Sequence, residues 1–431
     1  MHVGGVIAAV GALIFLAHFF SALFSRTRIP DVLLLTLLGL IVGPVLHLIT
    51  PAAFGSVGPV FTTVTLVLLL FEGGLDMHFD VLRKSLRGTV SLTLVNFAAT
   101  VAVVGGAGWR LAHLTPMNSL MLGAIVGGTS PAVIIPLSAQ LGLGRHASAT
   151  LFLESALSDV LSIIVTLALV DAARIGSVHV ASVLGGLLAS LIFSTLLGVS
   201  SALAWSLLIH RVRNLKHTAF TTAAFLFLVY GLVDYLGFSG PVTALAFGVT
   251  LGNIKLLDRS LRLLTMVEPM GLNINERSFL GESLFLLRTF FFVYVGLSIQ
   301  LTNTHWLVSG LAVALLIYVA RPAAVRLGAD HSLPRSDAAR MAALAPKGLA
   351  AAALASIPVQ QGLAQGALIQ SLVYVLILFT IVFATSLVFF QDRTALGRIY
   401  RWMFRSFGDD SRVVAPEPRA AATGAQGMET S

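Results

Sequence analysis

Residues 117–170 read MNSLMLGAIVGGTSPAVIIPLSAQLGLGRHASATLFLESALSDVLSIIVTLALV, and this stretch decides the fold. It holds two apolar segments, 117–142 and 147–170, each long enough to cross a bilayer. Gly-Gly-Thr-Ser-Pro at 127–131 interrupts the first segment, and the second carries Glu154 and Asp159. Because a carboxylate inside a membrane is costly, both acids are expected to have a defined role.

The composition of the whole chain agrees with a membrane setting. Of 431 residues, 57% are hydrophobic and only 11% are charged, whereas a soluble domain has about 25% charged residues. The absence of cysteine excludes disulfides, thiolate metal sites and thiol catalysis. The net charge of +8 is explained by basic loops at the inner membrane surface. We therefore expect an all-α polytopic membrane protein that needs no cofactor and binds no nucleic acid.

Counting apolar segments of spanning length gives thirteen transmembrane helices. They are expected at 3–24, 30–48, 57–75, 89–112, 117–142, 147–170, 178–209, 218–236, 239–254, 283–300, 306–326, 338–358 and 366–390. With the N-terminus outside and the C-terminus in the cytoplasm, almost all loop arginines and lysines fall inside, and Arg110 and Arg174 fall outside. This bias supports a multi-pass protein of the inner membrane. Residues 1–390 form the membrane domain, and 391–431 a short cytoplasmic tail, first basic and then disordered.

Two of these segments are interrupted. The fifth contains 127–131, and the twelfth contains Ala-Pro-Lys-Gly at 345–348. Proline removes a backbone donor and breaks a helix, and irregular backbone is tolerated at membrane depth where it is buried in protein or lines a cavity. The two lie seven spans apart, an odd number, so they cross the membrane in opposite directions. Two inverted six-helix halves follow, with the substrate site where the broken fifth and twelfth helices cross. Two ordinary proline kinks remain the alternative.

The buried charges divide into two groups. At a rise of about 1.5 Å per residue, Glu154 and Arg321 lie at a similar depth of roughly 10 Å from the inner surface, so a structural ion pair is expected. Asp159 points about 140° away from Glu154 and is expected to face a cavity. A pairing of Asp159 with Lys347 for stability alone remains open. Arg288 is expected to reach the membrane interface or to pair with Glu282.

A carboxylate at the depth of Asp159 can hold either a proton or a small cation, since burial disfavours its unpaired charge. One site that binds either ion and opens to one side at a time is sufficient for antiport. Neutral oxygen ligands for the monovalent ion are available nearby from Thr129, Ser130, Ser155 and Ser158. Such hydroxyls also satisfy backbone groups in kinked helices, and Lys347 can either neutralise half-helix ends or compete for Asp159.

Several motifs occur together and in order along residues 1–390. They are Arg-Ile-Pro at 28–30, GLIVGP at 39–44, FEGGLD at 71–76, GAIVGGTSPAV at 123–133, LESALSD at 153–159, FFFVYVGLSI at 290–299, Arg321 and PKGLAAAALA at 346–355. In this combination the chain resembles the sodium/proton exchanger type of monovalent cation:proton antiporters, in particular the short prokaryotic members. The resemblance implies a thirteen-helix inverted repeat, a homodimer and alternating access.

The resemblance also assigns roles by position. It implies that Asp159 binds the cation and the proton, that Glu154 and Arg321 form the family's acid–arginine pair, and that Thr129 is a ligand at the helix break. The chain departs from the family pattern at Ser130, which replaces an aspartate, and at Ser158, which replaces an asparagine.

The chain also has Lys347 at a position where many relatives have arginine. With one acid at the site, one Na⁺ or K⁺ is expected to exchange for one H⁺ without net charge movement, and the choice between the two cations stays open. Two alternatives are an organic anion carrier on a similar scaffold and an intramembrane enzyme. The latter lacks a Gly-x-Ser-x-Gly or His-Glu-x-x-His motif, so we expect a transporter and not an enzyme.

Overall fold

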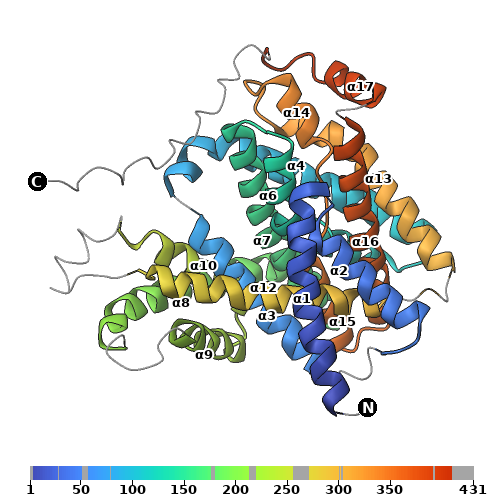
Figure 1. The fold of residues 1–431 in the computed structure, drawn as a ribbon. Coiled ribbons are helices and arrows are strands. Elements are labelled where there is room, and N and C mark those ends of the chain that lie inside the picture. The colour runs from blue at the N-terminus through green and yellow to red at the C-terminus, as the bar shows by residue number, and fades with distance from the viewer. Residues whose placement is uncertain are drawn as a thin grey trace, which may run out of the picture.

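The computed structural model describes residues 3–27, 29–50, 57–77, 79–175, 180–212, 220–255, 271–299, 301, 304–391 and 394–409. Within these ranges the chain is helical apart from loops and one isolated bridge between Pro334 and Gly408. The prediction of an all-α protein is confirmed (Figure 1). The disorder predicted for the end of the tail concerns positions after 409, which lie outside the described residues.

Each of the thirteen predicted segments contains helix. In chain order the elements are α1 (Val3–Thr27), α2 (Asp31–Leu40), the π-helical turn η1 (Ile41–Val45), α3 (Val57–Asp76), α4 (Phe79–Leu111), α5 (Pro116–Ile125), α6 (Pro131–Gln140), α7 (Arg145–Ile175), α8 (Val180–Val212), α9 (Thr221–Tyr235), α10 (Gly240–Gly252), α12 (Ile274–Leu297), α13 (Thr304–Gly328), α14 (Arg335–Met341), α15 (Leu349–Gln360), α16 (Gly366–Gln391) and α17 (Ala395–Met403).

Several helices have the length and composition of membrane spans. Among the described residues, seven helices are long and apolar enough to cross a bilayer, and four shorter apolar helices cover 31–45, 221–235, 240–252 and 349–360. Large apolar side chains remain on the outer surface of these helices, for example Phe15 on α1 and Val319 on α13. Such side chains are stable against lipid rather than water. The chain is therefore a multi-pass membrane protein.

One helix begins well before the predicted boundary. The α12 helix starts at Ile274, because Asn273 and Glu276 form a capping box that satisfies the first backbone N–H groups. On this helix Arg288 forms an ion pair with Asp31 of α2, at 3.0 Å. Of the two alternatives expected for Arg288, the membrane interface or a pair with Glu282, the pair with Glu282 is wrong, because the packing of α2 against α12 brings in Asp31 from a distant part of the chain.

Small residues let neighbouring helices approach closely. A Cβ atom at Gly248 of α10 would lie 2.2 Å from the Phe71 carbonyl oxygen of α3, and one at Gly296 of α12 would lie 2.1 Å from the Thr36 carbonyl oxygen of α2. Glycine is therefore required at both positions, as is typical of helix packing in membranes.

Several helices around the predicted site pack against α16, among them α5, α6, α13 and α15. In Figure 1, α14 and α15 lie at opposite ends of α16, so the chain between them crosses the middle of the molecule. The break between α5 and α6 meets it there.

Candidate ion-binding site

Two helix interruptions touch each other inside the molecule. The first separates α5, which ends at Ile125, from α6, which begins at Pro131; the second separates α14 from α15. The backbone N–H of Ser130 donates to the carbonyl oxygen of Pro346, at 2.8 Å. A Cβ atom at Gly348 would lie 2.1 Å from Ser130 Oγ, so the contact depends on glycine at this position. The two breaks therefore satisfy each other's polar groups in a buried place.

Lys347 links the same two breaks. Its side chain is fully buried, and its Nζ donates to the carbonyl oxygen of Gly128, at 2.9 Å. Its backbone N–H donates to Thr380 Oγ1 of α16, at 3.0 Å. Gly128 lies in the first break, three residues after the end of α5. The side chain of Lys347 therefore ties the second break to the backbone of the first.

Asp159 faces a small cavity between the two breaks. The cavity has a volume of about 10 Å³, room for about one water-sized particle. Its lining comes from the first break and the start of α6, from α7, from α3 and from the start of α15, and comprises Leu69, Gly128, Thr129, Ser130, Pro131, Asp159, Gly348, Leu349, Ala350 and Ala351. Asp159 is the one acid among these residues. The cavity therefore offers a single carboxylate, beside the hydroxyls of Thr129 and Ser130, to a small ion.

The hydroxyls of Ser155 and Ser158 lie behind Thr129 rather than on the cavity wall. The backbone N–H of Thr129 donates to Ser158 Oγ at 3.2 Å, and its Oγ1 donates to Ser155 Oγ at 3.1 Å. Each serine in turn donates to the backbone of α7, Ser155 to Leu151 and Ser158 to Ser155. These two serines thus hold Thr129 in position.

One residue beside the cavity was missed by the sequence predictions. Ser162 is buried, and its hydroxyl has no hydrogen-bond partner among the described residues. A Cβ atom placed on Gly128 would lie 2.6 Å from Asp159 Oδ1 and 3.1 Å from Ser162 Oγ. Both oxygens therefore face the bare Cα of Gly128. A serine three residues after Asp159 lies on the same helix face, and this spacing is the signal that could have identified it.

Glu154 and Arg321 meet away from this cavity. Both side chains are fully buried, and they form a two-pronged pair in which Nη2 of Arg321 donates to Oε2 of Glu154 at 2.8 Å and Nη1 donates to Oε1. The pair joins α7 to α13. Glu154 is therefore engaged by an arginine, whereas Asp159 lines the cavity.

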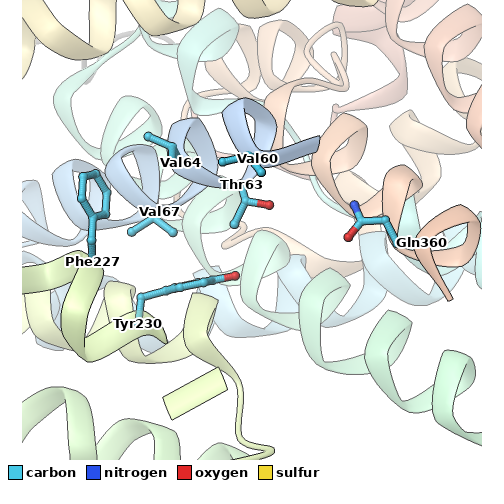
Figure 2. A pocket seen from close by; sticks show the side chains of 7 residues that line it. All are labelled: Val60, Thr63, Val64, Val67, Phe227, Tyr230 and Gln360. Carbon is cyan, nitrogen blue, oxygen red and sulfur yellow. The ribbon is translucent and has the colours of Figure 1, made fainter. Parts of the chain in front are cut away.

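A larger cavity lies along α3 next to this region. It has a volume of about 300 Å³ and is lined by Val60, Thr63, Val64, Val67, Phe227, Tyr230 and Gln360. Figure 2 shows Thr63 of α3, Tyr230 of α9 and Gln360 of α15 around the same space, with an apolar wall formed by the remaining side chains. Since Leu69 of α3 lines the small cavity, one helix borders both spaces.

Comparison with known proteins identifies the family of this chain. The family model for the transmembrane sodium/hydrogen exchanger matches residues 12–391. The chain is 26% identical over 368 residues to Na(+)/H(+) antiporter 1 of Methanocaldococcus jannaschii, covering 81% of this chain and 82% of that protein. It is 28% identical over 265 residues to the K(+)/H(+) antiporter NhaP2 of Shewanella sp. (strain MR-4), covering 58% of this chain and 43% of that protein.

A solved structure shares the fold. The sodium proton antiporter MjNhaP1 from Methanocaldococcus jannaschii, at pH 8, superposes with a TM-score of 0.69 and 23% identity, covering 90% of this chain and all of that chain. The matched family consists of membrane transporters, so the chain is a transporter and not an enzyme. The chain belongs to the transmembrane sodium/hydrogen exchanger family, and as such is a monovalent cation/proton antiporter.

Replacing Gly128 with alanine should weaken cation binding without unfolding the protein. The new Cβ would fall 2.6 Å from Asp159 Oδ1, so the short carboxylate side chain must move away from its place in the cavity. We expect the cation concentration for half-maximal exchange to rise by roughly tenfold or more, as for groups that orient an ion ligand. Gly106→Ala is the matched control, because no atom lies within 4 Å of its added Cβ. If the two variants need the same cation concentration for half-maximal exchange, Gly128 does not hold Asp159 in its binding position.

Proposed function

We propose that this chain exchanges one Na⁺ or K⁺ for one H⁺ at Asp159 by alternating access, without net charge movement, and so serves pH and cation homeostasis. The observation that carries the proposal is the position of Asp159, the one acid on a cavity built where two helix breaks touch. The printed functions of the relatives, a Na⁺/H⁺ and a K⁺/H⁺ antiporter, support both cations as candidates.

The proposed cycle follows from the cost of charge in a membrane. An ionised Asp159 without a partner is unfavourable at this depth. A bound proton or a bound monovalent cation each neutralises it, so the loaded site can turn from one side to the other in either form. Because both loaded forms carry the same charge, a full cycle moves no net charge.

The surrounding residues receive distinct roles in this proposal. Thr129 and Ser130 supply neutral oxygen ligands from the first break, and Ser155 and Ser158 keep Thr129 in place. Lys347 balances the carbonyl group of Gly128 in the first break. An organic anion carrier would need this ammonium to face its substrate, and its bond to a backbone carbonyl disfavours that alternative.

Ser162 adds a further ligand to the proposed site. Its buried hydroxyl faces Gly128 beside Asp159. We expect Ser162→Ala to raise the half-maximal cation concentration by roughly 2- to 10-fold, the value of one hydrogen bond, with unchanged folded yield. Ser371→Ala removes a buried hydroxyl that donates to its own helix, and it should leave this concentration unchanged. If both variants behave like the unmodified protein, Ser162 is not a ligand.

We further propose the architecture that this mechanism needs. Thirteen spans form two inverted six-helix halves, with the broken helices α5–α6 and α14–α15 crossing between them. Two copies associate as a homodimer in lipid of the inner membrane, with the N-terminus outside and the C-terminus in the cytoplasm. The contact between Ser130 and Pro346 and the resemblance in fold to MjNhaP1 support the crossing.

One-to-one exchange is tested by measuring proton movement across the membrane of vesicles that contain the purified protein and a pH-sensitive dye. An imposed Na⁺ or K⁺ gradient should drive protons in the opposite direction, and an added membrane potential should leave the rate unchanged. A rate that follows the potential would contradict one-to-one exchange, because moving one charge across 100 mV is worth about 2.3 kcal/mol.

A further inference from the structure

The α17 helix and the residues that follow it form an amphipathic element at one end of the molecule. Figure 1 shows α17 near α14, beyond the end of α16. The side chains of Phe404 and Phe407 are buried against the protein, and their rings contact each other edge to face. Within α17 itself, Gly397 is buried and Tyr400 and Met403 are half-buried, so this side of the helix faces the protein and the opposite side faces outward.

The outward face of α17 combines arginines with large apolar side chains. Trp402 is 60% exposed and Ile399 is 53% exposed, and Arg398, Arg401 and Arg405 are exposed beside them. The guanidinium of Arg405 lies 5.7 Å from the centre of the Trp402 ring. In the part of the chain that the structure describes, none of the three arginines pairs with an acid. The face therefore offers positive charge and apolar surface together.

The position of this face along the chain indicates its partner. The α16 helix is an apolar span that ends at Gln391, and α17 begins at Ala395. The face therefore lies within a few residues of the membrane surface. Tryptophan is typical of the headgroup level, and clusters of arginine directly after a span attract anionic lipids. We propose that Arg398, Arg401, Trp402 and Arg405 bind the headgroups of anionic phospholipids in the leaflet where α16 ends.

Specific contacts connect this lipid-binding face to the second helix break. Residues 404–409, here called the tail clamp, hold the loop before α14. The backbone N–H of Gly408 donates to Leu333 O, and that of Arg335 donates to Gly408 O, both at 3.0 Å. The side chain of Arg335 also forms an ion pair with Asp409. Arg335 is the first residue of α14, so lipid held by α17 steadies the half-helix that leads to the break.

The link between lipid binding and transport rests on the proposed function. If α14 moves during exchange, anionic lipid bound to α17 should change the exchange rate through the tail clamp.

Lipid binding is tested with a single reporter, because the chain contains no cysteine. Ser406→Cys, at an exposed position, is labelled with a polarity-sensitive dye in the full-length protein. The protein is reconstituted in phosphatidylcholine, or in equal parts of phosphatidylcholine and phosphatidylglycerol. We expect a blue-shifted emission only with phosphatidylglycerol, and less shift at high salt.

Variants of the arginines identify the interaction. Each arginine replaced by alanine should weaken docking roughly fivefold, so that R398A/R401A/R405A loses the shift, while the corresponding triple lysine variant retains it. An equal shift in pure phosphatidylcholine would mean apolar insertion without headgroup recognition, and it would overturn the proposal. A shift that survives in the triple alanine variant would overturn it as well.

The clamp is tested by R335A/D409N, which leaves the lipid-facing residues intact. Its dye should still shift with phosphatidylglycerol, while the dependence of the exchange rate on this lipid should disappear. R277A/D76N removes another exposed ion pair and should retain that dependence. Persistence in R335A/D409N would overturn the coupling. A chain that exchanges no cation in any vesicle would refute the proposed exchange at Asp159, and the dye shift would still decide lipid binding.

Discussion

Replacing Asp159 with asparagine should reduce cation-driven proton movement to the level of protein-free vesicles. The amide has nearly the shape of the carboxylate, but it can neither hold a proton at neutral pH nor neutralise a cation. Since Asp159 is the one acid on the cavity, no other lining residue can replace it. The folded yield should be unchanged, because the substitution removes a buried charge rather than adding one. Exchange is measured with a pH-sensitive dye trapped in the vesicles.

The matched control lies on the same helix. Asp171 is an exposed aspartate near the end of α7, and Asp171→Asn should exchange cations at the rate of the unmodified protein. If Asp159→Asn retains that rate while it is correctly folded, the ion does not bind at Asp159.

Replacing Arg321 with alanine should instead remove most of the folded protein. The change leaves Glu154 charged, fully buried and without its two-pronged partner. Breaking a buried pair costs about 3–5 kcal/mol, a large part of the roughly 5–15 kcal/mol that stabilises a typical protein. Size-exclusion profiles and thermal unfolding in detergent measure the loss. Arg321→Lys should be intermediate, since one ammonium cannot make both bonds.

Two further variants separate this structural role from ion binding. Arg326→Ala removes an exposed arginine from the same helix and should leave stability unchanged. Glu154→Gln should lower the folded yield more than it changes cation affinity. A stable Glu154→Gln protein with a shifted cation affinity would show that Glu154 is an ion ligand and not a structural partner.

The sequence was most informative where residues lie on one helix or at one depth. The helical angle between Glu154 and Asp159 predicted different surroundings for the two acids, and the structure places one beside Arg321 and the other on the cavity. The similar depth of Glu154 and Arg321 in the membrane was enough to predict their pairing, because few charged residues lie inside membrane spans.

Partners at the ends of spans were harder to predict. Several charges are available there, and the assignment of Arg288 to Glu282 was wrong because α2 supplies Asp31. Helical periodicity in the sequence likewise could not predict the contacts between the two helix breaks. The bond from Lys347 to Gly128 and the position of Ser162 against the same glycine required the three-dimensional arrangement.

Exchange at Asp159 is tested most directly by the uptake of radioactive sodium, or of rubidium in place of potassium, into vesicles that are acidic inside. We expect the purified chain to accumulate at least one of these cations as protons leave, and Asp159→Asn to accumulate neither. Uptake that is equal in the two proteins, or absent in both, would contradict exchange at Asp159.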